Sequence, residues 1–563
     1  MIEMNAEIKR WQASELLPPD YRKILETTSK EELFECFGGQ LGFGTGGMRG
    51  LMGVGPNRIN DFTIKGATIG LAHFLLEKFT LPIRVLIAYD TRRDGQRFAH
   101  VAAQTLAHFQ INSLLFKAPR PTPQLSYSVR QHQAQAGIVI TASHNPSDYN
   151  GYKLYDEYGC QFVPRLAERV AHLMRTKEDY FAFALEDYQS LLDKGVIAEL
   201  EQEEDESYLA FLRTLHPRVD INPQFKIVYS PLHGTGYAYG AKVLRDFGFN
   251  VDEVESQRLL DANFSTVKSP NPEVKETFTL AEKLGHQVKA SLLLVTDPDG
   301  DRLGVAVFDS GRYVYLNGSM LGALLLDYLT RINPPKPGAV MITTIVTPKL
   351  GPIIAQKHGI KVLTTLTGFK FIGEQIEELS QDESFYFGYE ESLGYLFSPQ
   401  VRDKDAFQAL IMTAHMFHDY FEQGKNITAI IEEMEREYGY FHDELLNYEF
   451  AGLQGKTLMA RIMQEIRRSG ETLFKGLDIA SIEDYRSGLK ITSPDHQGKL
   501  TLPSADVYRV IFNFGTVTFR PSGTEPKMKI YLSVHHDEQV IALTKFTVLK
   551  ERITSFMAKY QLR

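Results

Sequence analysis

Short runs of apolar, often β-branched residues recur through most of the chain. Each run is followed by a loop marked by Gly or Pro and then by a helical pattern. Such runs predict buried strands. They are Ile83–Asp90, Ser113–Phe116, Gly137–Thr141, Lys226–Ser230, Asn250–Val254, Ser291–Asp297, Ala339–Val346, Lys361–Leu366 and Ser384–Tyr389. After the first run, Arg97–Phe109 has apolar positions three and four apart, which predicts a helix. Because strands that alternate with helices are typical of parallel sheets covered on both faces, we predict three similar doubly wound α/β units.

The pattern changes after Asn426, where predicted strands follow one another more closely. These elements are a helix at Ile427–Tyr438, strands at Tyr440–Tyr448, Val507–Phe512, Thr516–Arg520 and Lys527–Val534, and a final helix at Asp537–Tyr560. We therefore expect a smaller C-terminal α+β domain. The acidic run Glu199–Glu206 is interpreted as a linker or a solvated helix face, and Asn333–Gly338 as a turn.

The predicted fold class is α/β, with four domains around a central cleft. We place the domains at residues 1–205, 206–312, 313–425 and 426–563. The length of 563 residues accommodates that number of hydrophobic cores.

Composition excludes several classes of protein. The formal net charge is −9, which argues against sequence-independent nucleic-acid binding, because that requires a basic face. The two cysteines, Cys36 and Cys160, can form at most one disulfide, as expected of a reduced cytosolic protein. The N-terminus has no apolar signal region, and no apolar run is long enough to span a membrane. We expect a soluble cytoplasmic protein that binds neither nucleic acid nor membrane.

Polar residues directly after two of the predicted strands are candidates for chemistry, because ligands in open α/β sheets bind at the carboxyl ends of strands. The strand Gly137–Thr141 continues into Ala142–Lys153 (ASHNPSDYNGYK), which we expect to expose Ser143 on a loop as a nucleophile. Ala142 and His144 break the G-x-S-x-G pattern of serine hydrolases. A purely structural turn stays open as the alternative.

The strand Ser291–Asp297 continues into Asp297–Arg302 (DPDGDR), called the aspartate loop below. Three carboxylates at alternate positions can converge on one hard cation, and oxygen-only ligands favour Mg²⁺ or Mn²⁺ over zinc. Arg302 beside them could bind a phosphate. The alternative is a solvated acidic turn.

Three further loops contain groups suited to sugars or phosphates. Gly388–Gly394 has Glu390 and Ser392, which could bind sugar hydroxyls or simply face solvent. Arg520–Lys527 combines Arg, hydroxyls and Gly, as in a phosphate-binding nest or an ordinary turn. Gly44–Gly50 contains Arg49, a further candidate anion ligand.

Together, these motifs resemble the α-D-phosphohexomutase superfamily, in its phosphoglucomutase/phosphomannomutase branch. The motifs are TASHNPSDYNGYK (Thr141–Lys153), DPDGDR (Asp297–Arg302), GYEES (Gly388–Ser392) and RPSGTEPK (Arg520–Lys527). They span nearly the whole chain, one in each predicted domain. Phe43–Gly50 (FGTGGMRG) is similar to an element of the long bacterial phosphoglucomutases. Tyr389 stands where Gly often precedes the sugar-binding Glu.

The resemblance implies a role for each motif. Ser143 would transfer the phosphoryl group as a phosphoserine, and Asp297, Asp299 and Asp301 would hold one Mg²⁺ together with the Ser143 phosphate. The implied substrate-binding residues are Arg302, Thr367, Gly368, Glu390, Ser392, Arg520, Ser522, Gly523 and Thr524. The implied catalytic residues around Ser143 are Arg49, His144, Lys153 and Lys404.

The implied reaction interconverts glucose 1-phosphate and glucose 6-phosphate through glucose 1,6-bisphosphate. Catalysis of phosphoryl transfer depends mostly on positioning and charge neutralisation, which a cation and basic side chains provide. Mannose phosphates and pentose phosphates stay open as alternative substrates. A metal-dependent phosphatase stays open as an alternative activity. The general acid/base is left among His144, Lys153 and Lys404, since a lysine can serve if burial and neighbouring cations lower its pKa.

Overall fold

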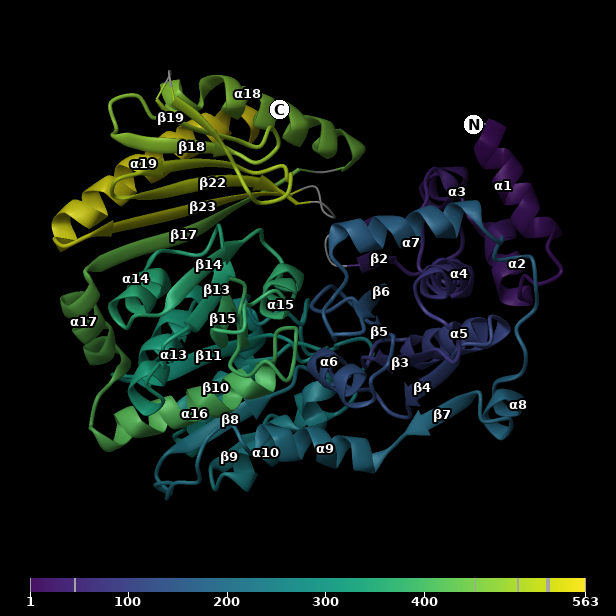
Figure 1. Cartoon of the computed structure of the whole chain (residues 1–563), viewed down its shortest axis with the longest axis horizontal. Coiled ribbons are helices and arrows are strands. Elements are labelled where there is room, and N and C mark those ends of the chain that lie inside the picture. Colours follow the sequence, from purple (N-terminus) through teal and green to yellow (C-terminus); the bar gives the residue numbers. More distant parts are fainter. Residues whose placement is uncertain (1, 45–46, 451, 494–495, 523–526, 562–563) are drawn as a thin grey trace. The chain divides into compact units, whose positions relative to one another are not determined.

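The computed structural model describes residues 2–44, 47–450, 452–493, 496–522 and 527–561 (Figure 1). These residues form two compact units. The first comprises Met1–Gly318, Gly368–Gln381 and Phe385–Gly424, and the second Ser319–Thr367, Asp382–Ser384 and Lys425–Arg563. Each unit is described by itself.

The first sheet of the first unit has seven strands in the order β1-β2-β6-β5-β3-β4-β7. The strands β5, β3, β4 and the edge strand β7 are parallel, whereas β2 and β6 are antiparallel to their neighbours. The strands are β1 (Phe43–Gly44), β2 (Gly47–Leu51), β3 (Arg84–Tyr89), β4 (Asn112–Phe116), β5 (Ala136–Ile140), β6 (Tyr149–Asp156) and β7 (Ile197–Leu200). The helices of this domain are α4 (Asp61–Lys78), α5 (Gly95–His108), α6 (Thr122–Gln131), α7 (Pro164–Thr176) and α8 (Tyr188–Asp193).

Three helices precede this sheet: α1 (Ile2–Ala13), α2 (Pro19–Thr27) and α3 (Lys30–Phe37). Their apolar residues meet around Trp11, which is fully buried against Phe37 and Phe62. Phe62 lies on α4, so this cluster attaches the N-terminal helices to the first domain.

The second sheet of the first unit has five strands in the order β12-β11-β10-β8-β9. Its parallel strands are β8 (Lys226–Ser230), β9 (Asn250–Glu253) and β10 (Leu292–Thr296), and β11 (Leu303–Asp309) and β12 (Arg312–Leu316) add an antiparallel edge. The accompanying α-helices are α9 (Gln202–Leu212), α10 (Gly240–Asp246), α11 (Glu255–Arg258) and α12 (Thr279–Val288). The sheets expected to be parallel are therefore mixed, because strand hairpins extend the parallel cores.

The next stretch of chain supplies elements to both units. In the second unit β13 (Ala339–Thr344) and β14 (Lys361–Thr365) pair in parallel. Apart from Ser384, β15 (Ser384–Glu390) belongs to the first unit, where it pairs antiparallel with β16 (Gly394–Leu396). The helices are α13 (Gly318–Ile332), α14 (Leu350–Lys357), α15 (Phe369–Glu377), α16 (Ala406–Glu422) and α17 (Ile427–Tyr438).

The C-terminal part of the second unit contains a sheet in the order β17-β23-β22-β21-β18-β19-β20, antiparallel throughout. The long helices α18 (Gly452–Leu473) and α19 (Gln539–Gln561) pack on one face of it (Figure 1). The strands are β17 (Tyr440–Glu449), β18 (Ile479–Asp484), β19 (Leu489–Ser493), β20 (His496–Lys499), β21 (Tyr508–Phe512), β22 (Gly515–Pro521) and β23 (Lys527–His536). The sequence did not predict β18, β19, β20 or α18.

Two segments interpreted as loops are strands. The second half of the Ala142–Lys153 segment belongs to β6, which pairs antiparallel with β5, and Arg49 lies on β2, which pairs with β6. Cys36 and Cys160 are buried free thiols. Among the helices of the described ranges, none combines the length and the apolar character that a membrane span requires.

Candidate active site

Ser143 lies three residues beyond the end of β5 and is only 3% exposed. Its Oγ donates a hydrogen bond to Oδ2 of Asp297 at 3.0 Å and lies 3.2 Å from Nδ1 of His144. The expectation of an exposed serine is therefore wrong, because the aspartate loop of the second domain covers the hydroxyl. The Ser143 backbone has φ 52°, in the left-handed region that a serine seldom adopts.

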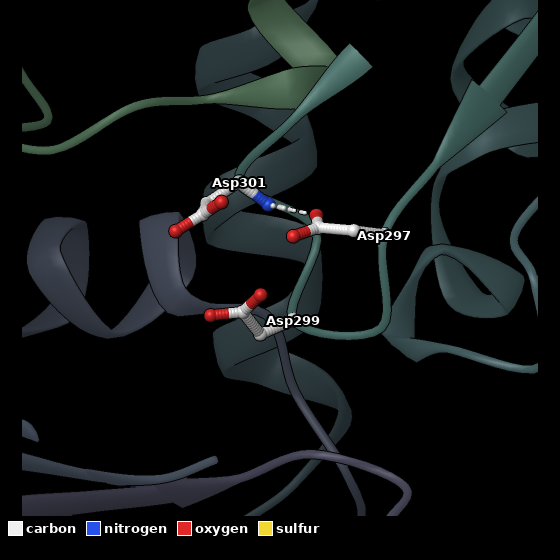
Figure 2. Close-up of side chains that lie close together, drawn as sticks. All are labelled: Asp297, Asp299 and Asp301. Carbon is white, nitrogen blue, oxygen red and sulfur yellow. Dashed lines mark hydrogen bonds between the residues drawn. The ribbon is translucent and has the colours of Figure 1, made fainter. Parts of the chain in front are cut away.

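The aspartate loop turns sharply after β10 and brings three carboxyl groups together (Figure 2). One oxygen from each of Asp297, Asp299 and Asp301 lies within 4.8 Å of the others, and all three residues are buried. The backbone N–H groups of Asp301 and Arg302 both donate to Oδ1 of Asp297 at 3.0 Å. Gly300 has φ 66°, so the turn suits a residue without Cβ.

The carboxyl groups fit a hard cation. Oδ1 of Asp299 and Oδ1 of Asp301 are buried and make no hydrogen bond. Buried carboxylate oxygens without partners are costly, and a coordinated metal removes that cost. Burial and the adjacent Asp301 and Asp299 raise the pKa of Asp297 well above its usual range. Oxygen-only ligands of this charge suit Mg²⁺.

Two lysines distant in sequence from the aspartate loop contact it. Nζ of Lys153, on β6, lies 2.7 Å from Oδ2 of Asp299, and Nζ of Lys404 lies 3.1 Å from Oδ2 of Asp301. Lys404 directly precedes the Asp405 cap of α16, whose carboxylate accepts from the backbone N–H groups of Phe407 and Gln408. We call Ser143, the three aspartates and the two lysines the serine–aspartate centre.

Both lysines have a raised pKa. Burial alone lowers the pKa of Lys153, but the carboxylates of Asp299 and Asp301 outweigh it. For Lys404 the effect of burial is likewise outweighed by Asp301 and by carboxylates that include Glu390. The lowered lysine pKa considered from the sequence is therefore not present, because anionic neighbours dominate over cationic ones. A divalent cation bound to the aspartates would offset their charge and weaken this effect.

The two arginines predicted for the site have different partners, and Arg49 contacts the serine loop (residues 141–149). Nη1 of Arg49 donates to Oδ1 of Asn145 at 2.8 Å, and Nη1 of Arg302 donates to Oε1 of Glu273 at 2.8 Å. The backbone carbonyl of His144 accepts from Oγ of Ser269, in the second domain, at 2.8 Å. The serine loop is thus held by groups from two domains.

Glu390 lies at the end of β15 and is 3% exposed. Its Oε1 accepts a hydrogen bond from the backbone N–H of Gly368 at 2.7 Å, which joins two predicted substrate-binding residues within the first unit. Its charge also contributes to the raised pKa of Lys404. Ser392 lies in the turn between β15 and β16. Thr367 belongs to the second unit.

The Arg520 hairpin consists of β22 and β23 in the second unit. Arg520 pairs with Lys529, and the backbone N–H of Ser522 donates to the carbonyl of Lys527 at 2.7 Å. Arg520 and Ser522 are both half-buried. Gly523 and Thr524, predicted to bind phosphate, lie outside the described residues.

Sequence reasoning missed three residues that support the site. Asp90 and Arg92 follow β3. They could have been found by the rule that ligands in open α/β sheets bind at the carboxyl ends of strands. Thr122 carried no such signal: its Oγ1 donates to Oδ2 of Asp299 at 2.9 Å across a domain boundary.

Three family models match consecutive parts of the chain. They describe alpha/beta/alpha domains I, II and III of phosphoglucomutase/phosphomannomutase and match residues 40–181, 206–310 and 317–438.

The chain belongs to the phosphoglucomutase/phosphomannomutase family.

Members of this family are phosphotransferases of the isomerase class. The chain is 39% identical over 522 residues to a phosphoglucomutase of Staphylococcus haemolyticus, covering 91% of this chain and 94% of that protein. It is 35% identical over 519 residues to a phosphoglucomutase of Staphylococcus aureus, covering 91% and 93%.

Solved structures of the phosphoglucomutase/phosphomannomutase family share the fold. The open form of parafusin, a phosphoglucomutase of Paramecium, aligns with a TM-score of 0.68 at 17% identity over 92% of this chain and 96% of that one. A family protein of Burkholderia thailandensis aligns with a TM-score of 0.66 at 16% identity over the same shares.

Proposed function

We propose that this protein is a phosphoglucomutase that interconverts α-D-glucose 1-phosphate and glucose 6-phosphate through glucose 1,6-bisphosphate. The observation that supports this most directly is the position of Ser143. Its Oγ contacts Asp297 beside two carboxylates whose free oxygens suit a metal. A phosphoryl group on this oxygen would need a cation there, because phosphate beside three carboxylates is otherwise strongly repelled.

In this proposal each part of the first unit has one task. Ser143 accepts the phosphoryl group from the bisphosphate and donates it to the sugar phosphate. Asp297, Asp299 and Asp301 hold one Mg²⁺, which would neutralise charge on the phosphoryl oxygens. Lys153 and Lys404 place further positive charge beside these carboxylates.

Sugar recognition is assigned to Glu390 and Ser392, together with Thr367 and with Gly368, whose backbone N–H donates to Glu390. Arg49 and Arg302 are proposed to contact phosphoryl oxygens. Arg520, Ser522, Gly523 and Thr524 are proposed to bind the phosphate that is not transferred, since an Arg with adjacent hydroxyls and backbone N–H groups matches such a ligand.

The general acid/base is proposed to be one of His144, Lys153 and Lys404. Nδ1 of His144 is 3.2 Å from the Ser143 hydroxyl, whereas both lysines are held protonated by carboxylates. A protonated lysine can act as the acid directly, and it can act as the base only once a bound cation lowers its pKa. Alanine variants of the three residues should decide, because only loss of the true group removes a limb of the pH–rate profile.

A comparison of substrates tests the function itself. Glucose 1-phosphate, mannose 1-phosphate and ribose 1-phosphate would be assayed at equal concentrations, with Mg²⁺ and glucose 1,6-bisphosphate present. We expect the highest kcat/KM for glucose 1-phosphate. A higher value for mannose or ribose 1-phosphate would reassign the substrate, and release of inorganic phosphate instead of isomerisation would reassign the reaction to a phosphatase.

A further inference from the structure

The side chain of Arg92 contacts the serine loop at several points. It follows β3 and is buried. Four backbone carbonyls accept hydrogen bonds from its two terminal nitrogens. Nη2 donates to Ser143 and Asn145, both at 2.6 Å, and Nη1 donates to Pro146 at 2.7 Å and Tyr149 at 3.1 Å. One planar guanidinium therefore fixes most of the loop that presents the serine.

Asp90 anchors this arrangement and extends it to the other backbone group of Ser143. Nε of Arg92 forms an ion pair with Oδ2 of Asp90 at 3.2 Å. The same oxygen accepts from Oγ1 of Thr141 at 2.5 Å, and Oγ1 in turn accepts from the backbone N–H of Ser143 at 2.8 Å. The carbonyl and the N–H of Ser143 are thus both bound by groups that Asp90 holds.

A residue of the second domain packs against the guanidinium. The Arg92 carbon Cζ lies 4.9 Å from the ring centroid of Phe264, which is 1% exposed. This contact places an aromatic face against the cation, an arrangement that favours a single orientation of the planar group.

Ser143 needs such support because of its backbone conformation. A φ of 52° is disfavoured for any residue with a Cβ, and such strain persists only where the surroundings fix the backbone. The direction of Oγ toward Asp297 depends on that conformation. Release of the backbone would let Ser143 relax and turn its hydroxyl away from the aspartates.

We propose that Arg92, supported by Asp90 and Thr141, is a positioning residue that holds Ser143 in the conformation required for phosphoryl transfer. The inference rests on the proposed function and deepens it. Arg92 touches no reacting atom. It acts only through the backbone of the serine loop, so its loss should reduce the rate of transfer and leave binding of substrate and metal intact.

The variant Arg92→Lys tests this, because one ammonium group keeps the charge but does not reproduce the fork that reaches four carbonyls. We expect kcat to fall about 100-fold, the loss that a displacement of about 1 Å can cause. The KM for glucose 1-phosphate and the affinity for Mn²⁺ used as a probe should change less than about threefold. The adjacent Arg93 is exposed, so Arg93→Lys is the matched control and should retain the wild-type kcat.

Chemical rescue separates positioning from general stability. Methylguanidinium added to Arg92→Ala should restore kcat at least tenfold, and an equal concentration of methylammonium should not. If the Arg92 variants do not fold, Thr141→Val provides the same test, because it removes only the hydroxyl that binds the Ser143 N–H. It should lower kcat without raising KM.

A folded Arg92→Lys with a kcat within threefold of the wild type would overturn the inference. Where no Arg92 variant folds, an unaltered kcat in Thr141→Val would do so. An effect confined to KM would overturn it as well. These results differ from failure of the proposed function, in which the wild-type protein itself would show no mutase turnover.

Discussion

The serine–aspartate centre and the Arg520 hairpin are both proposed to bind phosphate, yet they are built differently. The centre is buried except for the partly buried Lys404, and its groups come from the loop after β5, from β6, from the loop after β10 and from the residues before α16. The Arg520 hairpin consists of two adjacent strands in the second unit, with Arg520 and Ser522 half-buried. Contacts distant in sequence therefore determine the first site, and local strand pairing determines the second.

This difference predicts how each region responds to substitution. In the centre, charges are desolvated and bound to one another, so removing one group leaves others unpaired. In the hairpin, a half-buried side chain can be removed with less disturbance of its neighbours. We therefore expect changes in the centre to abolish chemistry or metal binding, and changes in the hairpin to weaken substrate binding.

The largest effect is expected for Ser143→Ala. Without the hydroxyl no phosphoenzyme forms, so turnover should fall by ~10⁴-fold or more. Mass spectrometry after incubation with glucose 1,6-bisphosphate should show one added phosphoryl group in the wild type and none in the variant. Ser147→Ala, in the same loop, is the control. Phosphorylation of the Ser143→Ala protein at another residue would reassign the nucleophile.

The next largest is expected for Asp299→Asn. It removes one ligand charge and the ion-pair partner of Lys153. Because loss of a mere supporting contact weakens metal binding by about 10- to 100-fold, loss of a ligand should cost on the order of 100-fold or more. Titration with Mn²⁺ followed by electron paramagnetic resonance measures the affinity. Asp252→Asn, in the same domain, should bind as the wild type does, and equal affinity in both variants would remove the aspartate loop from metal binding.

An intermediate effect is expected for Arg520→Ala. Loss of a bidentate contact with phosphate should cost about 2–4 kcal/mol, or roughly 30- to 1,000-fold in kcat/KM. Most of this loss should come from KM, since the proposed contact is made equally in the ground and transition states. Steady-state kinetics with glucose 1-phosphate measure both constants. The exposed Arg486 provides the control Arg486→Ala. A wild-type KM in Arg520→Ala would show that the hairpin is only a turn.

The smallest effect is expected for Thr122→Val. This variant is also the sharpest test of whether a residue of the first domain supports the aspartate loop of the second. The substitution keeps the shape but removes the hydrogen bond to Asp299. A hydrogen bond to a charged group contributes about 1.5–3 kcal/mol, so the affinity for Mn²⁺ should fall by roughly 10- to 100-fold. Thr176→Val, on the exposed side of α7, should have no effect. If both variants bind equally well, the aspartate loop is organised by its own turn alone.

The sequence by itself determined many of the strands and helices, and it drew attention to the polar residues that follow two of those strands. Lys226–Ser230 and Ile427–Tyr438 match β8 and α17 residue for residue, because an apolar run or an amphipathic period is a local property of the chain. The aspartate loop could likewise be recognised from the sequence, because three carboxylates placed after a buried strand require a partner wherever the strand lies.

Only the tertiary structure decided which groups meet at the aspartates. Lys404 was proposed through family resemblance, but its contact with Asp301 depends on how the residues before α16 lie against the second domain. Lys153 was assigned to a loop, and its place on β6 follows from pairing with β5. Arg92 and Thr122 act through hydrogen bonds to the serine loop and to Asp299. Neither periodicity nor local motif spacing encodes the partners in such contacts, which form only once the strands of the first sheet have paired and the domains have packed.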